Sequence, residues 1–165
     1  PERQAEIAAL ARTAKKKGLD YWLWVHELDD IPAQFRSGKA AGGRVEFDDP
    51  ALFVYLKQRY ERLLDLNPGA RGLILTFHES GARIFQNRTV SSRLSVPERI
   101  VKLTSLIDGV VRARKQKLMI RNFFYEPKEI LWFEEALKSL PKDLLLMRKD
   151  TCHEFNPFYP ADPLH

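Results

Sequence analysis

Carboxylate, imidazole and guanidinium side chains follow four short apolar segments of the chain, each at the point where the segment ends. The clusters are Trp24–Glu27, Phe77–Ser80, Arg121–Tyr125 and Arg148–Glu154. In folds that alternate strands and helices, functional residues lie where parallel strands end and loops begin. Four such clusters in register therefore predict one shared site at one edge of a parallel sheet.

Glu79 is the first candidate for chemistry, because it follows a wholly apolar segment and precedes a Ser-Gly pair. A carboxyl group beside low-dielectric walls has a raised pKa, which suits a general acid near neutral pH. Hydrolysis of a glycosidic bond needs a second carboxylate, and Asp150 or Glu154 could act as base or nucleophile. The sequence thus predicts a glycoside hydrolase-like, carbohydrate-active protein. The alternative for Glu79 is a loop residue that pairs with Arg83.

Other members of the four clusters are candidates for substrate binding. A guanidinium or ammonium group at a strand end could bind the carboxylate of an acidic sugar, but it could also form a structural pair with Glu79 or Asp150. Glu27 has a similar alternative as a salt-bridge partner or a helix cap. The predicted substrate-binding residues are His26, Glu27, His78, Arg121, Asn122, Tyr125, Lys149, His153 and Tyr159.

Three of the histidines could together bind a metal ion, because His26, His78 and His153 all lie at or just beyond the ends of predicted strands. No His-Glu-x-x-His spacing on a helix accompanies them, so we expect no metal and no other cofactor. Hydrogen bonding to sugar hydroxyls or to a carboxylate is the favoured role. A metal-dependent barrel hydrolase or isomerase stays an alternative, as does a non-catalytic carbohydrate-binding barrel.

The composition limits the partners. The chain has 165 residues and a net charge of +5, but the basic runs at 15–17 and 112–117 fall at the ends of predicted helices, where cations complement the helix dipole. We therefore expect a carbohydrate substrate and no nucleic acid. No apolar run approaches the roughly 18 residues that span a bilayer, and the single Cys152 allows no internal disulfide. The chain begins with Pro rather than Met, and its compartment and oligomeric state are left open.

Helices and strands alternate in the predicted order. Helices are expected over residues 3–18 and from Pro50, Ser95 and Pro127, and strands over 20–27, 72–78, 117–124 and 144–148. Long loops cover 28–49 and 80–94. Such alternation predicts (βα) repeats with parallel strands in a single α/β domain over residues 1–165. Four βα units are half of a TIM (β/α)8 barrel, so we interpret the chain as a partial barrel. A small flavodoxin-like sheet is the alternative, but no Gly-rich phosphate-binding turn follows the first strand.

Three of these stretches are distantly similar to the family-67 α-glucuronidases. Residues 72–81 resemble the strand that ends in that family's general-acid glutamate, and residues 121–125 match its Arg-x-Phe-x-Tyr pattern. Residues 149–160 resemble a segment with Lys, an acidic-Phe pair and Pro. The resemblance implies a barrel glycoside hydrolase with Glu79 as general acid, acting on a sugar that contains uronic acid.

The chain departs from the family pattern at the base side of the reaction. The glutamate that the family places just before the last Pro corresponds to Tyr159, and its partner aspartate falls in the 130–132 region, where no acid is aligned. Only Glu79 is carried over as a catalytic carboxylate. The similarity therefore implies a carbohydrate-active barrel more than one particular substrate.

Overall fold

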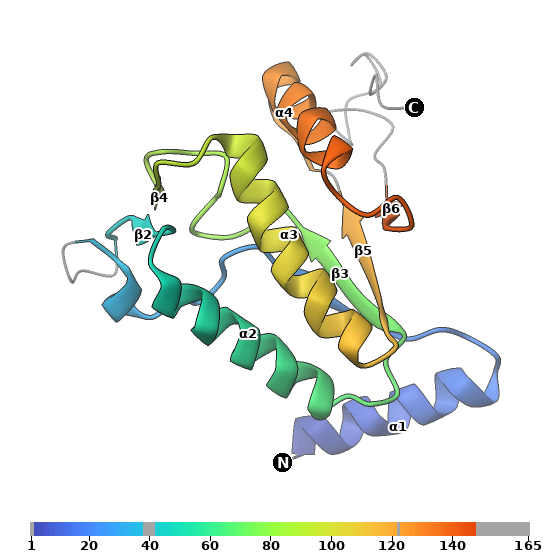
Figure 1. Cartoon of the computed structure of the whole chain (residues 1–165). Coiled ribbons are helices and arrows are strands. Elements are labelled where there is room, and N and C mark those ends of the chain that lie inside the picture. The colour runs from blue at the N-terminus through green and yellow to red at the C-terminus, as the bar shows by residue number, and fades with distance from the viewer. Residues whose placement is uncertain (1, 38–41, 122, 148–165) are drawn as a thin grey trace.

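The computed structural model describes residues 2–37, 42–121 and 123–147 (Figure 1). The main helices and strands alternate as the sequence predicts. In chain order the elements are α1 (Glu2–Lys16), β1 (Trp22–His26), the 3-10 helix η1 (Ala33–Phe35), β2 (Val45–Glu46), α2 (Pro50–Asp65), β3 (Gly72–Thr76), β4 (Val90–Ser91), α3 (Val96–Ala113), β5 (Lys117–Arg121), α4 (Pro127–Lys138) and β6 (Leu145–Met147).

Four parallel strands form the main sheet in the order β1-β3-β5-β6. Its register pairs His26 with Thr76 and Thr76 with Arg121, and Arg121 in turn pairs with Met147. Consecutive strands of the βα pattern are thus neighbours in space. The carboxyl ends of β1, β3 and β5 lie side by side at one edge of the sheet, which is where sequence reasoning places the site. The chain is a mixed α/β protein with parallel strands, in keeping with βα repeats.

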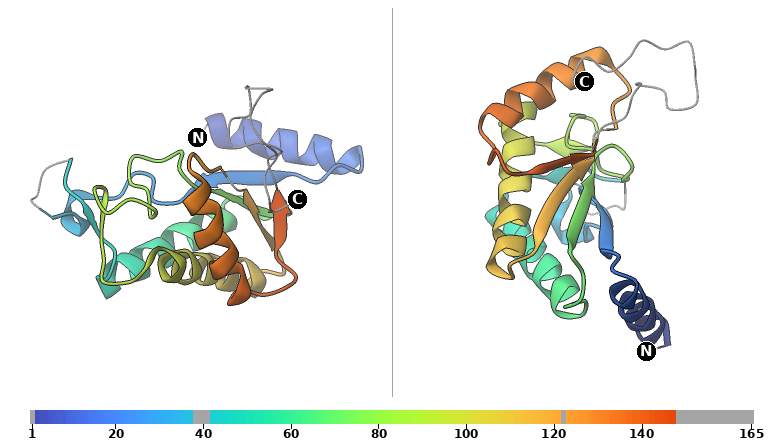
Figure 2. Two further views of the ribbon diagram at one scale, coloured as in Figure 1. Left: turned by 90° about the horizontal axis from the view of Figure 1, so that it is seen from above. Right: turned by 90° about the vertical axis from the view of Figure 1, so that its right-hand side faces the viewer.

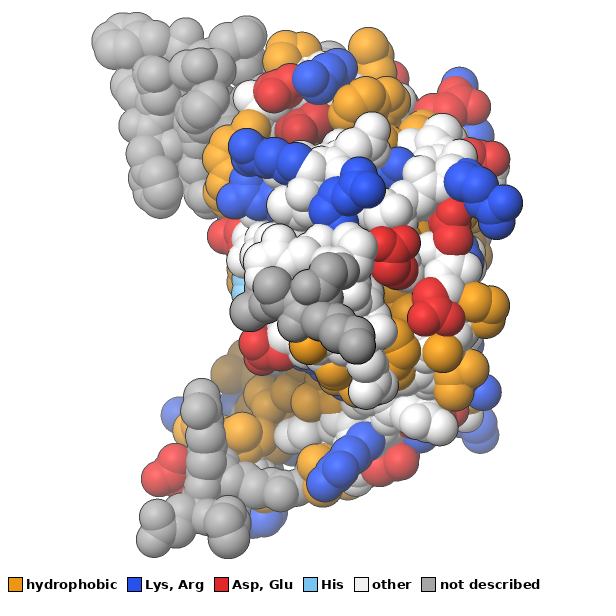
Figure 3. Space-filling view, turned by 90° about the vertical axis from the view of Figure 1, so that its left-hand side faces the viewer, with side chains coloured by type: hydrophobic (Ala, Val, Ile, Leu, Met, Phe, Trp, Pro, Cys, Tyr) orange, Lys and Arg blue, Asp and Glu red, His pale blue; other side chains and the backbone are white. Residues whose placement is uncertain are grey.

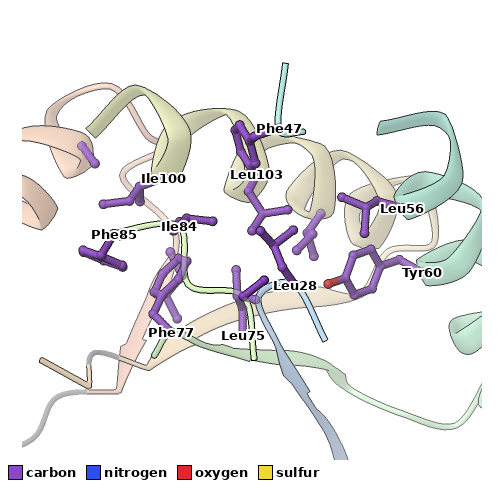
Figure 4. Close-up of a cluster of buried hydrophobic side chains, with 14 of the residues drawn as sticks. Leu28, Phe47, Leu56, Tyr60, Leu75, Phe77, Ile84, Phe85, Ile100 and Leu103 are labelled. Carbon is purple, nitrogen blue, oxygen red and sulfur yellow. The ribbon is translucent and has the colours of Figure 1, made fainter. Parts of the chain in front are cut away.

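Helices α2, α3 and α4 cover one face of this sheet, and α1 lies on the other side (Figure 2). Alternate strand residues, including Leu73, Leu75, Leu118 and Ile120, belong to the core on the helix side. Figure 4 shows this core, where Leu56 and Tyr60 of α2 and Ile100 and Leu103 of α3 meet the sheet and its loops. Burial of such side chains is the main favourable contribution to folding. Leu10 of α1 keeps 66% of its surface exposed.

Local signals in the sequence explain where the helices begin. Asp49 caps α2, because its side chain accepts a hydrogen bond from the Ala51 amide at 2.8 Å, and Pro50 occupies the first turn. At α3, the Ser95 amide donates to the Glu98 carboxylate at 2.7 Å, half of the predicted capping box. Among the described residues, no helix is both long and apolar enough to cross a bilayer.

The two long loops contain a small parallel sheet that the sequence does not predict. β2 pairs with β4 through Val45 and Val90, both fully buried. The same loops bring further side chains into the core, among them Leu28, Phe35, Phe47, Ile84 and Phe85. The loops are therefore packed structural segments that extend the core beyond the carboxyl end of the main sheet. Figure 3 views this end of the molecule, where basic side chains lie among acidic ones.

The predicted strands extend too far, above all at their carboxyl ends. The strand predicted over 72–78 ends at Thr76, because His78 adopts a left-handed backbone conformation with φ of 70° that leaves the extended ladder. The strand predicted over 20–27 covers Trp22–His26, and the one predicted over 117–124 ends at Arg121. Within the described residues, His26 and Arg121 are consequently the last residues of their strands, and His78 and Glu79 lie just beyond the end of theirs.

Candidate functional site

A cation and a carboxylate meet at the carboxyl ends of the central strands. Arg121 Nη1 lies 3.2 Å from Glu79 Oε2. The Arg121 guanidinium lies 5.2 Å from the ring centre of Trp24 and 4.7 Å from that of Phe123, within the range of cation–π attraction. We call Trp24, Glu79, Arg121 and Phe123 the rim cluster. It joins residues from β1, β5 and the loops after β3 and β5.

Exposure divides the rim cluster into a buried base and an accessible surface. Arg121 is only 8% exposed, whereas Trp24 is 50% exposed and the Glu79 side chain 33%. The arrangement is the ion pair with Glu79 that sequence reasoning leaves open as an alternative role for Arg121. Glu79 and Trp24 are therefore the most exposed members of the cluster, whereas Phe123 is partly buried. Together they offer carboxylate oxygens that accept hydrogen bonds and part of an aromatic ring.

Tyr125 continues the aromatic surface next to the rim cluster. Its ring centre lies 5.4 Å from that of Phe123, and the Arg83 guanidinium lies 5.6 Å from the Tyr125 ring centre. Tyr125 is 42% exposed, so a ligand could reach its ring. The sequence leaves open a pair between Glu79 and Arg83. In the structure Arg83 contacts the Tyr125 ring and Glu79 pairs with Arg121.

Glu27 lies beneath the rim and is fully buried. One carboxyl oxygen accepts the His78 amide at 2.8 Å, and the other accepts the Ile84 amide at 3.0 Å. Glu27 follows Leu23 and Val25 on the helix side of β1, so strand alternation turns it away from Trp24 and His26. Burial raises its pKa to about 8, against the opposing effect of these two amides. The structure thus places Glu27 in contact with the loop after β3.

The buried carboxyl group of Glu27 predicts a specific dependence of stability on pH. Its pKa is about 8 in the folded protein and 4.5 by default, so between these values the folded protein holds a proton that the unfolded chain has released. Stability from this group therefore falls as pH rises, by about 1.4 kcal/mol per unit. Between pH 6 and pH 8, the free energy of unfolding of the wild type is expected to fall by about 2 kcal/mol more than that of Glu27→Gln. Urea unfolding of both proteins at the two pH values measures this, and parallel pH profiles would contradict it.

His78 is buried as well, in an aromatic and acidic environment. Its ring centre lies 4.3 Å from that of Phe85, and its Nε2 lies 3.4 Å from Glu129 Oε2. Neither ring nitrogen makes a hydrogen bond within the described part of the chain. Burial, with Arg83 nearby, lowers the pKa of His78 to about 4, so the ring is neutral at pH 7. His78 is placed as a packing group below the rim surface, although the sequence suggests a substrate-binding role.

Glu129 links the rim loop to α4. Its Oε2 accepts the amides of Tyr125 at 2.9 Å and Glu126 at 3.1 Å, as a carboxylate does in a capping box. Burial raises the pKa of Glu129. These contacts fix the chain that carries Phe123 and Tyr125 against the first turn of α4, and so set the position of the aromatic surface.

Arg99 is a buried cation that organises the loop after β3 from the α3 side. Its guanidinium donates to the carbonyl oxygens of Ile84 at 3.1 Å and Leu94 at 2.9 Å, and to the Asn87 side chain at 2.8 Å. Sequence reasoning does not single out Arg99, because its acceptors are backbone carbonyls that no residue type reveals. Trp24 belongs to the first cluster that the sequence predicts, but it is not among the predicted substrate-binding residues, although its alternation with His26 on one strand face is a usable signal.

The remaining predicted site residues divide into two groups. His26 ends β1 on the same face as Trp24, is partly buried, and has no hydrogen bond to Nδ1 in the described part of the chain. The others lie outside the described residues: Asn122, Lys149, Asp150, His153, Glu154 and Tyr159. The structure therefore brings together Glu79, Arg121 and Tyr125, with His78 and Glu27 beneath them.

No metal centre accompanies the rim in the described ranges. There, no three His, Cys, Asp or Glu side chains are placed to hold a metal ion together. A cavity of about 560 Å³ lies between the first turn of α3 and the end of α4, lined by residues such as Pro97, Val101 and Ala136. None of its lining residues belongs to the rim cluster, so the chemistry-bearing residues and this cavity are separate features.

Fold and site together define an α/β protein of parallel βα repeats that carries an acidic, basic and aromatic cluster at the carboxyl end of its sheet. No family model matches the chain, and no curated protein or solved structure matches it either.

Proposed function

We propose that the chain is part of a (β/α)8 barrel whose rim binds a carbohydrate, in a glycoside hydrolase-like protein. Two features of the sheet support the barrel. Its strands follow one another in sequence order, and the three helices that connect them, α2, α3 and α4, all lie on one face (Figure 2), whereas the connecting helices of doubly wound sheets lie on both faces. Helix α1 precedes the first strand and lies on the other side. In barrels of this type the loops at the carboxyl ends of the strands form the binding site.

The observation that carries the proposal is the half-exposed Trp24 ring beside the Glu79–Arg121 pair. A pyranose ring has an apolar face of C–H groups that can stack on an aromatic ring, and hydroxyls around its edge that donate hydrogen bonds. Trp24 offers the first contact, and the partly exposed Glu79 carboxylate accepts the second. Tyr125 and Arg83 lie next to this surface and would extend it to a second sugar unit.

Trp24→Ala is expected to weaken oligosaccharide binding about tenfold, because loss of one stacking platform costs about 1.4 kcal/mol. Calorimetric titration of the full chain with an oligosaccharide that carries glucuronic acid, and with a neutral one of equal length, measures this. Trp22→Ala is the matched control, since Trp22 lies on the same face of β1 at the opposite end of the strand, and it should change affinity less than twofold. Equal losses in both variants, or no binding of either sugar by the wild type, would contradict the proposal.

Hydrolysis of a glycosidic bond is the second candidate, with Glu79 as the proton donor. It is favoured by the position of the Glu79 carboxylate, which is partly exposed just after the central strand β3. The reaction needs another carboxylate, for which the sequence names Asp150 and Glu154, both outside the described residues. Turnover that disappears when Glu79 is replaced would establish this activity.

A further inference from the structure

We propose that Glu27 is a positioning residue for the rim, because its carboxyl group sets the path of the loop after β3 and thereby holds Glu79 against Arg121. The inference rests on the proposed function of the rim and deepens it. Glu27 itself is fully buried and would not touch a sugar.

Glu27 is itself fixed by the sheet. Its amide donates to the Thr76 carbonyl at 3.2 Å, which continues the β1–β3 ladder one residue beyond β1. The carboxyl oxygens then accept the amides of His78 at 2.8 Å and Ile84 at 3.0 Å. One side chain on a fixed strand end therefore joins the two ends of the 78–84 segment.

The backbone of His78 adopts a conformation that needs support from its surroundings. Its φ of 70° lies in the left-handed region, which is unfavourable for residues other than glycine. The hydrogen bond to Glu27 holds the His78 amide in this conformation, and the buried His78 ring is packed against Phe85. The turn ends the ladder immediately before Glu79, whose carboxylate lies 3.2 Å from Arg121 of the next strand.

The loop after β3 is also held from the α3 side, by Arg99. The Ile84 carbonyl accepts from Arg99 at 3.1 Å while the Ile84 amide donates to Glu27. Two buried ionisable side chains, Glu27 and Arg99, thus bind the N–H and the C=O of the same residue, Ile84. Burying such groups opposes folding unless they are well hydrogen-bonded. The hydrogen bonds of Glu27 and Arg99 therefore indicate that the loop is held in one specific conformation, which packing of apolar side chains alone would not determine.

The test is a double-mutant cycle of Glu27→Gln and Glu79→Gln in the full chain, read by titration with an oligosaccharide that carries glucuronic acid. Gln presents an N–H₂ group where one oxygen accepted an amide, so one of the two hydrogen bonds is lost. Glu27→Gln is expected to lower affinity about tenfold in the wild-type background and less than twofold in the Glu79→Gln background, because Glu27 acts through Glu79. Equal losses in both backgrounds would assign Glu27 a general structural role and overturn the inference.

A second readout separates failure of this inference from failure of the proposed function. In Glu27→Gln, hydrogen exchange at the His78 and Ile84 amides should become at least tenfold faster and the side-chain carboxyl carbon signal of Glu79 should move, while the Ile120 amide of β5 stays unchanged. Unchanged exchange at both amides would overturn the inference, whether or not the wild type binds sugar. If Glu27→Gln does not fold, Glu27→Asp serves the same purpose, since the shorter side chain cannot reach both amides.

Discussion

Gly72→Ala is expected to destabilise the folded protein by about 3 kcal/mol, because no space exists for one more methyl group where β3 begins. A Cβ atom at this position would lie 1.8 Å from the carbonyl oxygen of Lys117 and 2.7 Å from its carbonyl carbon. Gly72 pairs with Trp22 on one side and Lys117 on the other, so the neighbouring backbone cannot move without breaking the sheet. Urea unfolding at constant pH measures the loss.

Gly109→Ala is the matched control for this substitution. Gly109 lies within α3, and nothing lies within 4 Å of the position that its Cβ would take. Alanine is the better helix former by about 1 kcal/mol, so the same chemical change is expected to stabilise the protein. Equal stability of Gly72→Ala and the wild type would show that β3 and β5 are not paired in this register.

Glu79→Gln is expected to abolish glycoside hydrolysis, lowering the rate at least 100-fold, if Glu79 donates the proton to the leaving group. Gln has nearly the same shape and can hydrogen-bond to Arg121, but it has no acidic proton to give. The Glu79 side chain is one-third exposed, and Gln still accepts a hydrogen bond from the buried Arg121, so stability should change by only about 1 kcal/mol. Release of reducing sugar under substrate saturation measures the rate.

Glu61→Gln is the control for the loss of one carboxylate. Glu61 lies on α2, where it pairs with Lys57 on the helix surface, and its replacement should leave turnover unchanged. Turnover retained by Glu79→Gln would remove Glu79 as the acid. The sugar-binding role of the rim would then stand on the Trp24 comparison.

The fold is predictable from the sequence where local signals determine structure. Asp49-Pro50 and the Ser95 to Glu98 segment mark helix starts that the structure confirms, since a cap depends on residues within one turn. The β2–β4 sheet is not predictable in this way. It consists of two residues per strand from loops far apart in the sequence, and neither segment shows the alternation that reveals longer strands.

The candidate site is predictable at the level of which segments meet, but not of what each side chain does. Glu79 and Arg121 meet as expected, because parallel strands end at a common edge. The inward role of Glu27 depends on amides that lie 51 and 57 residues further along the chain. Strand alternation with Leu23 and Val25 indicates its direction, yet it does not identify the partners. The neutral, buried state of His78 likewise arises from Phe85 and its other tertiary neighbours.

The central claim is that the rim cluster binds carbohydrate, and an NMR titration of the isotope-labelled chain tests it most directly. On addition of an oligosaccharide that carries glucuronic acid, we predict that the indole signal of Trp24 and the amide signals of Glu79 and Tyr125 move together with one dissociation constant. The amides of Val101 and Ala136, which line the separate cavity between α3 and α4, should stay in place. Shifts confined to that cavity, or none at the rim at millimolar sugar, would contradict the account.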